Sequence, residues 1–205
     1  MRLAGRMVLT LLMLSLGAVS SAASYEEGVH YVRLQNPGPR IDLQAKHEVV
    51  ELFWYGCSHC FRFEPHIAKW LESKPDDVHF IRVPAALNKR WETHARAYYA
   101  LELMGQLEHA HKLLFEAIHE QGRRLMDKQS IARFLGQNGV NEEQFLKTYD
   151  SLEVETKLNR AKELPIQYGI TGTPAIIVDG TYRISPSQAG SYPAVLEIVD
   201  QLTSK

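Results

Sequence analysis

The distribution of strand-like segments is the feature that most constrains the fold of this 205-residue chain. Short runs rich in β-branched and aromatic residues occur before residue 84 and again after residue 174. Between them, residues 91–167 contain no such run and are rich in Ala, Leu, Glu, Gln and Lys, which favour helices. The pattern predicts an α/β fold in which a helical block interrupts a sheet.

The first part of the predicted sheet is a strand–helix–strand unit. Glu48–Tyr55 is short, β-branched and aromatic, which is typical of a buried strand. Helical spacing follows over Phe61–Ser73, where Pro65 predicts a kink or a broken first turn, and Val78–Val83 is the second strand. Upstream, the alternation over Tyr25–Leu34 predicts an edge strand.

The second part returns after the helical block. A strand over Ala175–Val178, a turn at Asp179-Gly180 and a strand over Thr181–Ile184 predict a hairpin, and Tyr192–Leu202 predicts a closing helix. We therefore expect a sheet-containing domain made of residues 24–87 and 166–205, with a helical domain of residues 88–165 inserted. Within the block we expect four or five helices, near residues 91–104, 107–120, 128–137, 142–150 and 152–167.

Residues 1–23 have the composition of a secretory signal peptide. Arg2 and Arg6 precede a 13-residue apolar run, Met7–Val19, which small residues follow. An uncleaved membrane anchor is the alternative, but a span needs about 20 apolar residues. We expect cleavage after Ala22 or Ala23 and a mature protein in an oxidising compartment, where disulfide chemistry is favoured.

The chain has two cysteines, and they form one Cys57-Ser58-His59-Cys60 segment at a strand-to-helix junction. The unpaired N–H groups and partial positive charge of a helix N-terminus favour a thiolate at Cys57. His59 is a second source of positive charge, and such surroundings can lower a cysteine pKa from about 8.5 to roughly 3.5–7.5. Because the thiolate exists only in the reduced protein, its stabilisation makes the disulfide a stronger oxidant. Cys60, one turn further on, is the expected resolving thiol.

Other site chemistries fit the sequence less well. A zinc site needs four ligands, and Cys57, Cys60 and His66 leave the set one short. A structural disulfide here would close a loop too short to add much stability. The formal net charge of -1 argues against nucleic-acid binding driven by bulk charge. We therefore expect no metal, no cofactor and no nucleic acid.

The remaining aromatic and histidine residues give weaker signals. Trp54 and Tyr55 are either core aromatics or part of a surface beside Cys57, and Trp54 fluorescence should report on the disulfide in either case. The histidines of the helical block are interpreted as exposed surface residues. They are His94, His109, His111 and His119.

The segment VVELFWYGCSHCFRFEPH resembles the active-site segment of DsbA-like thiol:disulfide interchange proteins, in the thioredoxin superfamily. YEEGVHYVRL resembles that family's opening strand, and Gly172-Thr173-Pro174-Ala175 resembles the loop that carries the superfamily's cis-proline. The helical block lies where these proteins insert a helical domain. The resemblance covers the whole mature chain and implies a thioredoxin fold with an inserted all-helical domain.

The resemblance also implies residue roles. Cys57 matches the nucleophilic cysteine and Cys60 its buried partner, while His59 matches a histidine that helps to hold the thiolate. Pro174 matches the cis-proline beside the disulfide. Thr173 matches the residue whose backbone pairs with an incoming peptide as an added strand does.

Two further positions carry an open question each. Glu51 matches a buried acid beneath the active site, which would modulate exchange or carry a proton; a carboxylate facing water at the strand edge is the alternative. Ser58 departs from the Pro-His dipeptide typical of the family and relaxes the φ constraint of proline. The strength of the oxidant is therefore left open.

The resemblance implies an oxidase in the periplasm of a Gram-negative bacterium. The enzyme would donate the Cys57–Cys60 disulfide to unfolded or reduced secreted proteins through a mixed disulfide, from an apolar, adaptable surface. A DsbB-type quinone-linked membrane reoxidase would restore the disulfide, and the protein is expected to be a monomer. A periplasmic reductase or isomerase with the same site is one alternative. A secreted chaperone with a vestigial disulfide is another.

Overall fold

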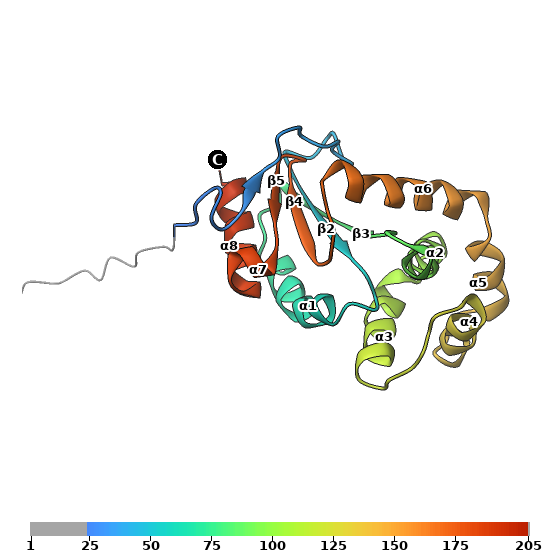
Figure 1. The fold of residues 1–205 in the computed structure, drawn as a ribbon. Coiled ribbons are helices and arrows are strands. Elements are labelled where there is room, and N and C mark those ends of the chain that lie inside the picture. The colour runs from blue at the N-terminus through green and yellow to red at the C-terminus, as the bar shows by residue number, and fades with distance from the viewer. Residues whose placement is uncertain (1–23, 205) are drawn as a thin grey trace, which may run out of the picture.

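A five-stranded mixed sheet with strand order β1-β5-β4-β2-β3 lies at the centre of the fold (Figure 1). The computed structural model describes residues 24–204, so the expected signal peptide lies outside the described residues. β2 pairs with β3 in parallel and with β4 antiparallel, and β4, β5 and β1 continue antiparallel. The strands are β1 (Val32–Arg33), β2 (His47–Phe53), β3 (Val78–Pro84), β4 (Ala175–Val178) and β5 (Tyr182–Ile184).

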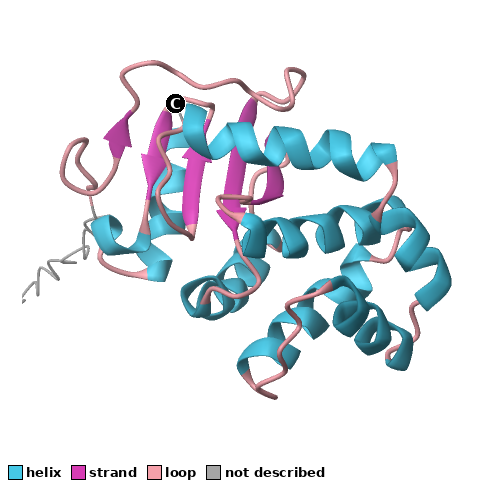
Figure 2. Ribbon diagram, turned by 45° about the vertical axis from the view of Figure 1, so that its right-hand side comes forward, coloured by secondary structure: helices cyan, strands magenta, loops and turns pink. Residues whose placement is uncertain are grey.

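The helices lie on both faces of this sheet and beyond one end of it (Figure 2). α1 and α8 pack together on one face, while α2–α6 stand between β3 and β4 in sequence, as the helical block predicts. The observed boundaries in the block lie within two residues of the predicted ones. The helices are α1 (Ser58–Leu71), α2 (Lys89–Leu103), α3 (Leu107–His119), α4 (Lys128–Gln137), α5 (Glu142–Tyr149), α6 (Leu152–Gln167), α7 (Pro186–Ala189) and α8 (Tyr192–Thr203).

Alternation along β2 divides the core between the two faces. Val49 packs with α1 and α8, whereas Val50 and Leu52 belong to the apolar cluster formed with the helical block. The cluster that contains Val50 and Leu52 is continuous from the sheet into α2–α6. The predicted boundary at residue 165 falls inside α6, and the division into two domains stays a prediction.

Two local predictions differ from the structure. The edge strand expected over Tyr25–Leu34 is wrong except at Val32–Arg33, because a turn with Gly28 at φ +85° occupies its first half. Of the kink or broken first turn expected at Pro65, the broken turn is wrong, because α1 begins at Ser58 and continues through the proline. Burial of Phe63, Ile67 and Trp70 on one face of α1 offsets the cost of about 3 kcal/mol that an internal proline brings.

The predicted hairpin is confirmed. Asp179 and Gly180 both have positive φ, at 50° and 62°, as the central residues of a type I′ turn require. The hairpin places β4 beside β2, and this brings the loop before Ala175 to the end of β2 where the two cysteines lie. Within residues 24–204, no helix is long and apolar enough to cross a membrane.

Candidate active site

Cys57 occupies the N-cap position of α1, four residues beyond the buried end of β2. Its backbone is extended, with φ -91° and ψ 112°, and its sulfur accepts a hydrogen bond from the backbone N–H of Cys60 at 3.3 Å. The connecting loop is packed tightly, since a Cβ atom on Gly56 would lie 2.3 Å from the Trp54 ring. The sulfur therefore stands at the positive end of a helix, as the sequence predicts.

The surroundings of Cys57 favour its thiolate. A hydrogen bond from the Cys60 thiol, helped by the Thr173 hydroxyl and the backbone N–H groups of Cys60 and His59, lowers the pKa of Cys57 to about 5 against the opposing effect of burial. In the thiol form, Cys57 donates to the Thr173 carbonyl at 3.3 Å. The Thr173 hydroxyl is shielded from solvent and has no well-aligned partner among the described residues.

Cys60 differs from Cys57 in every respect that governs reactivity. Its side chain is fully buried, and burial, together with the neighbouring Cys57 and Glu51, raises the pKa of Cys60 well above its ordinary value. Both cysteines are free thiols in this structure. One accessible thiolate beside one buried thiol is the asymmetry that a nucleophile and a resolving cysteine need.

The loop before β4 faces this pair. The Thr173–Pro174 peptide bond is cis, as the resemblance implies, and the Thr173 carbonyl meets the Cys57 sulfur. His59 contacts the site through both its ring and its backbone. Its ring nitrogen Nδ1 lies 3.2 Å from the Tyr192 hydroxyl and 3.1 Å from Arg62 Nη2, and its backbone N–H is among the groups that lower the pKa of Cys57.

Glu51 lies in the core and not in water, so the strand-edge alternative is wrong. Its side chain is 0% exposed, and its Oε2 lies 3.2 Å from Arg82 Nε. Burial, reinforced by the charge of Glu64 and opposed by Arg82, raises the pKa of Glu51 to about 8. Arg82 also contacts Glu64 through Nη2 at 3.0 Å, so two carboxyl groups share one guanidinium.

The expectation of exposed histidines is wrong for His94 and His111, which are 2% and 9% exposed. His119 is half-buried, and its Nε2 lies 2.8 Å from the Tyr55 carbonyl, two residues before Cys57. A signal for His111 was available in the sequence. It falls four residues after Leu107 and four before Phe115, on the apolar stripe of α3.

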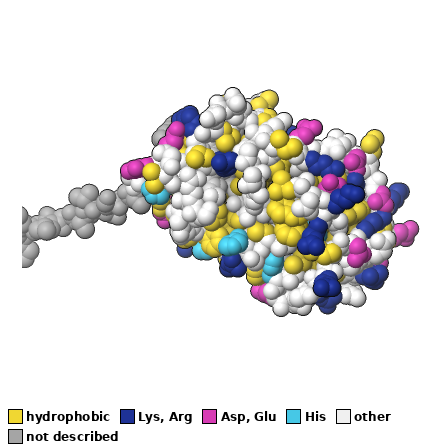
Figure 3. Space-filling view, in the orientation of Figure 1, with side chains coloured by type: hydrophobic (Ala, Val, Ile, Leu, Met, Phe, Trp, Pro, Cys, Tyr) yellow, Lys and Arg dark blue, Asp and Glu magenta, His cyan; other side chains and the backbone are white. Residues whose placement is uncertain are grey.

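A groove of about 710 Å³ opens beside the cysteine pair. Its walls come from His59, the loop 169–175, Arg183, the segment 185–188 and Tyr192, and its described lining contains no carboxylate. Most of the exposed lining is apolar, although Ser, Thr and Gln side chains contribute to it. Apolar side chains also gather on the central part of the face shown in Figure 3. Trp54 stacks on Trp91, with ring centroids 4.6 Å apart.

The described residues contain no group of three or more His, Cys, Asp or Glu side chains arranged to bind a metal ion. The site presents two sulfurs with buried charged groups beneath them. A sheet of this topology, with a Cys-x-x-Cys segment at a helix N-terminus opposite a cis-proline loop, defines a dithiol protein of the thioredoxin fold.

Comparisons with known proteins narrow this class. The family model described as a DSBA-like thioredoxin domain matches residues 77–191. The thiol:disulfide interchange protein DsbA of Pseudomonas syringae pv. tomato is 42% identical over 188 residues, which are 92% of this chain and 87% of the relative. A crystal structure of Pseudomonas aeruginosa DsbA is 41% identical with a TM-score of 0.83, covering 88% of this chain and 93% of that one. The chain belongs to the DsbA-like thioredoxin family.

More distant members keep the same fold. The oxidoreductase NmDsbA1 from N. meningitidis is 27% identical, with a TM-score of 0.77 over 87% of this chain and 92% of its own. The match to the family model begins after Cys60, so it rests on the helical block and the cis-proline loop, and not on the cysteines. The predicted thioredoxin fold is thus confirmed by a match that does not depend on the two cysteines.

Proposed function

We propose that this chain is a periplasmic dithiol oxidase that transfers the Cys57–Cys60 disulfide to secreted proteins. The observation that carries the proposal is the contrast between the two sulfurs. Cys57 is accessible and has its pKa lowered to about 5, while Cys60 is buried and has its pKa raised. A protein that holds a thiolate in its reduced form has an oxidising disulfide.

The reaction follows from this contrast. A substrate thiolate attacks the Cys57 sulfur, the S–S bond breaks, and Cys60 leaves as a thiolate that takes up a proton. A second substrate thiolate then attacks the substrate sulfur of the mixed disulfide, and Cys57 leaves as a stabilised thiolate. The substrate loses two electrons and two protons; one proton ends on Cys60 and the other in solvent.

The remaining site residues support these steps. Thr173 would pair its backbone with the incoming peptide, next to the cis Pro174 and the groove. Glu51 would supply the proton to Cys60, since it lies buried near both sulfurs and retains a proton at neutral pH. The backbone N–H of His59 would hold the Cys57 thiolate, and Ser58 would tune its strength from the first helical position.

The cellular setting follows from the sequence and the family. The signal peptide predicted over residues 1–23 and the oxidising chemistry fit the periplasm of a Gram-negative bacterium, and the relatives include proteins from Pseudomonas and Bordetella. The substrates would be unfolded or reduced secreted proteins. A DsbB-type quinone-linked membrane protein would reoxidise the cysteines. We propose a monomer, which light scattering of the mature protein would test.

The deciding experiment is the redox equilibrium of the mature protein in graded glutathione buffers, read by thiol trapping and Trp fluorescence. We expect the protein to stay reduced until the buffer is strongly oxidising. A protein that stays oxidised in mildly reducing buffer would favour the reductase or isomerase. If Cys57→Ser kept both substrate binding and any cellular phenotype, the chaperone alternative would replace the catalytic one.

A further inference from the structure

His111 connects the helical block to the charges beneath the active site. It comes from α3, and its ring packs edge-on against Phe53 and Phe115 at centroid distances of 5.3 and 5.2 Å. Its Nδ1 lies 2.9 Å from the Tyr55 hydroxyl and its Nε2 lies 3.4 Å from Glu64 Oε1. The proposed exchange steps make no use of this buried imidazole.

The two contacts define one protonation state of the ring. Burial raises the pKa of Tyr55 well above its ordinary value, so the phenol keeps its proton and can donate it to Nδ1. Burial also lowers the pKa of His111, so the ring carries one proton at neutral pH. That proton then resides on Nε2, facing Glu64. The opposite tautomer would point a nitrogen lone pair at a carboxylate.

His111 Nε2 and Glu64 Oε1 face each other in the protein interior. His111 Nε2 and Glu64 Oε1 are both shielded from solvent, and neither has a well-aligned hydrogen bond among the described residues. A buried N–H and a buried carboxylate oxygen 3.4 Å apart are therefore each other's available partner. The charge of Arg82, from β3, also acts on the ring, and Arg82, Glu51, Glu64 and His111 form one buried cluster.

The cluster holds one positive charge for two carboxyl groups. Arg82 contacts Glu64 at 3.0 Å and Glu51 at 3.2 Å, and one guanidinium neutralises one carboxylate. One of the two acids must therefore retain a proton in this buried site. Glu64 has a second donor, His111, whereas Glu51 has none beyond Arg82. The imidazole thus decides which acid is ionised.

We propose that His111 is a positioning residue for disulfide exchange: by donating from Nε2 to Glu64 it keeps that acid ionised and leaves the exchangeable proton on Glu51. The inference rests on the proposed function, in which Glu51 passes this proton to the Cys60 thiolate and recovers one from solvent. The pKa directions agree with the geometry. Burial opposes ionisation of Glu64, but His111 and Arg82 outweigh it and lower the pKa of Glu64.

The test compares His111→Leu with His111→Gln. Glutamine can accept from Tyr55 and donate to Glu64, whereas leucine fills the space with neither group. The readout is the pH profile of the rate at which a dithiol reduces the oxidised protein. In the wild type we expect an inflection near the Glu51 pKa of about 8. His111→Leu should move this inflection lower by roughly one pH unit, because Arg82 then shifts towards Glu51, and His111→Gln should keep it.

An unchanged profile in a folded His111→Leu variant would overturn the inference. Nitrogen-15 NMR of the histidine-labelled wild type is a second test that needs no variant. It should show His111 as a neutral ring protonated at Nε2 at pH 7, and an Nδ1–H tautomer or an imidazolium would overturn the inference. The glutathione equilibrium of the wild type tests the proposed function separately. An oxidising wild type with an unchanged His111→Leu profile would refute the role of His111 alone.

Discussion

Two glutamates of β2, Glu48 and Glu51, have the same side chain and the same complete burial, yet their surroundings differ. Because they are three residues apart, they face opposite sides of the sheet. Glu48 accepts the backbone N–H groups of Ile41, at 2.8 Å, and of Asp42. Glu51 meets only Arg82, at 3.2 Å, and neither of its oxygens has a well-aligned hydrogen bond among the described residues.

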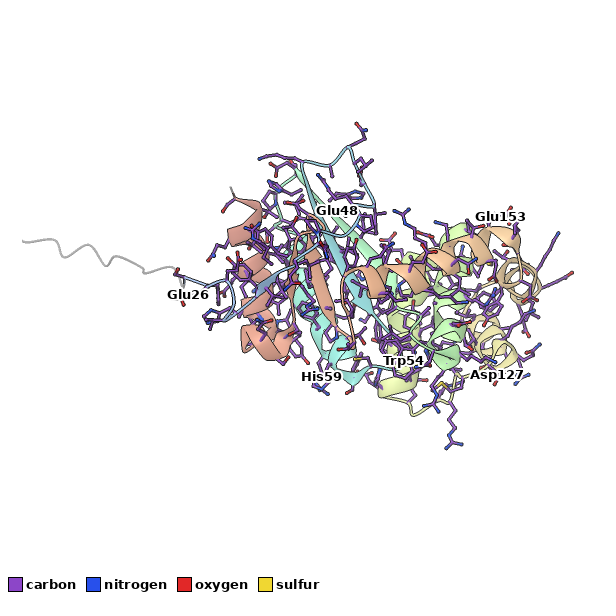
Figure 4. The ribbon with its side chains drawn as sticks, turned by 45° about the horizontal axis from the view of Figure 1, so that its top comes forward. Glu26, Glu48, Trp54, His59, Asp127 and Glu153 are labelled. Atoms are coloured by element: carbon purple, nitrogen blue, oxygen red, sulfur yellow. The ribbon has the colours of Figure 1, made fainter. Side chains whose placement is uncertain are left out.

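These surroundings separate two regions of the molecule. At the amino end of β2, Glu48 holds the preceding loop, and Asp179 accepts the Glu48 backbone N–H at 2.8 Å. At the carboxyl end lie Glu51 and the cysteine pair. Figure 4 shows Glu48 and His59 near opposite ends of the strands. A buried carboxylate with all its hydrogen bonds made, such as Glu48, stabilises the fold. A buried carboxyl group that lacks them, such as Glu51, is one whose proton can move.

The largest expected effect is at the amino end. Glu48→Leu leaves the backbone N–H groups of Ile41 and Asp42 buried without an acceptor. We expect the free energy of unfolding to fall by about 3 kcal/mol, at about 1–3 kcal/mol for each unpaired group. Urea denaturation would measure this loss. The pKa of Cys57, read from thiolate absorbance, should stay at about 5. A clear change in that pKa would show that the two regions are coupled.

Glu51→Gln, at the carboxyl end of β2, should instead change the rate of disulfide exchange. We expect disulfide exchange to slow about tenfold at pH 7, or about 1.4 kcal/mol in activation free energy, because the proton donor to Cys60 is lost. Stopped-flow reduction of the oxidised protein would measure the rate. Glu51→Asp, which retains a carboxyl group, is the matched control and should recover part of the rate. A Glu51→Gln rate equal to the wild type would remove Glu51 from the mechanism.

Glu51→Gln should also change how the free energy of unfolding depends on pH. Burial raises the pKa of Glu51 to about 8, so between its ordinary pKa and pH 8 the folded state binds one more proton than the unfolded state. This group therefore lowers stability progressively as pH rises through that window. Glu51→Gln should stabilise the oxidised protein more at pH 8 than at pH 5. Equal effects at both pH values would mean that Glu51 is ionised throughout.

Sequence alone predicted the order of helices and strands along the chain, because helix and strand periodicities differ clearly over long segments. It also located Cys57 at a helix N-terminus, since a glycine after a buried strand marks such a junction. The sequence predicts an edge strand that is longer than the one observed. Alternation over Tyr25–Leu34 indicates a two-sided segment, but strand pairing also needs a partner, and β5 reaches only Val32 and Arg33.

The buried charges were harder to predict from sequence. Glu51 emerged only from the family resemblance, because one acid within an apolar strand is equally compatible with an edge position. Arg82 and Glu64 come from β3 and α1, and their meeting depends on tertiary packing. His111 was misjudged because histidine is common on surfaces, although its place on the stripe of α3 pointed inward.

Thr173→Val tests the surroundings of the Cys57 sulfur, and we expect a smaller effect than for the two glutamate variants. The hydroxyl of Thr173 is one of the groups that lower the pKa of Cys57. Valine keeps the shape and removes that donor, so the pKa of Cys57 should rise by roughly half a pH unit. Thiolate absorbance against pH would measure it. The free energy of unfolding should not fall, because a buried hydroxyl without a well-aligned partner is removed. A loss of stability would place Thr173 with Glu48 as a structural group.

Ser58→Pro should have the smallest effect. Ser58 is the first residue of α1, where proline fits the helical φ and where the lost N–H has no partner within the helix. We expect the free energy of unfolding to rise by about 0.5 kcal/mol through the unfolded state. The N–H groups that hold the sulfur belong to His59 and Cys60, so the loss of the Ser58 N–H removes none of them. A stiffer first turn should lower the pKa of Cys57 by only a few tenths. A rise in that pKa would mean that Ser58 itself supports the thiolate, and that the fold-stabilising and sulfur-controlling groups overlap at this position.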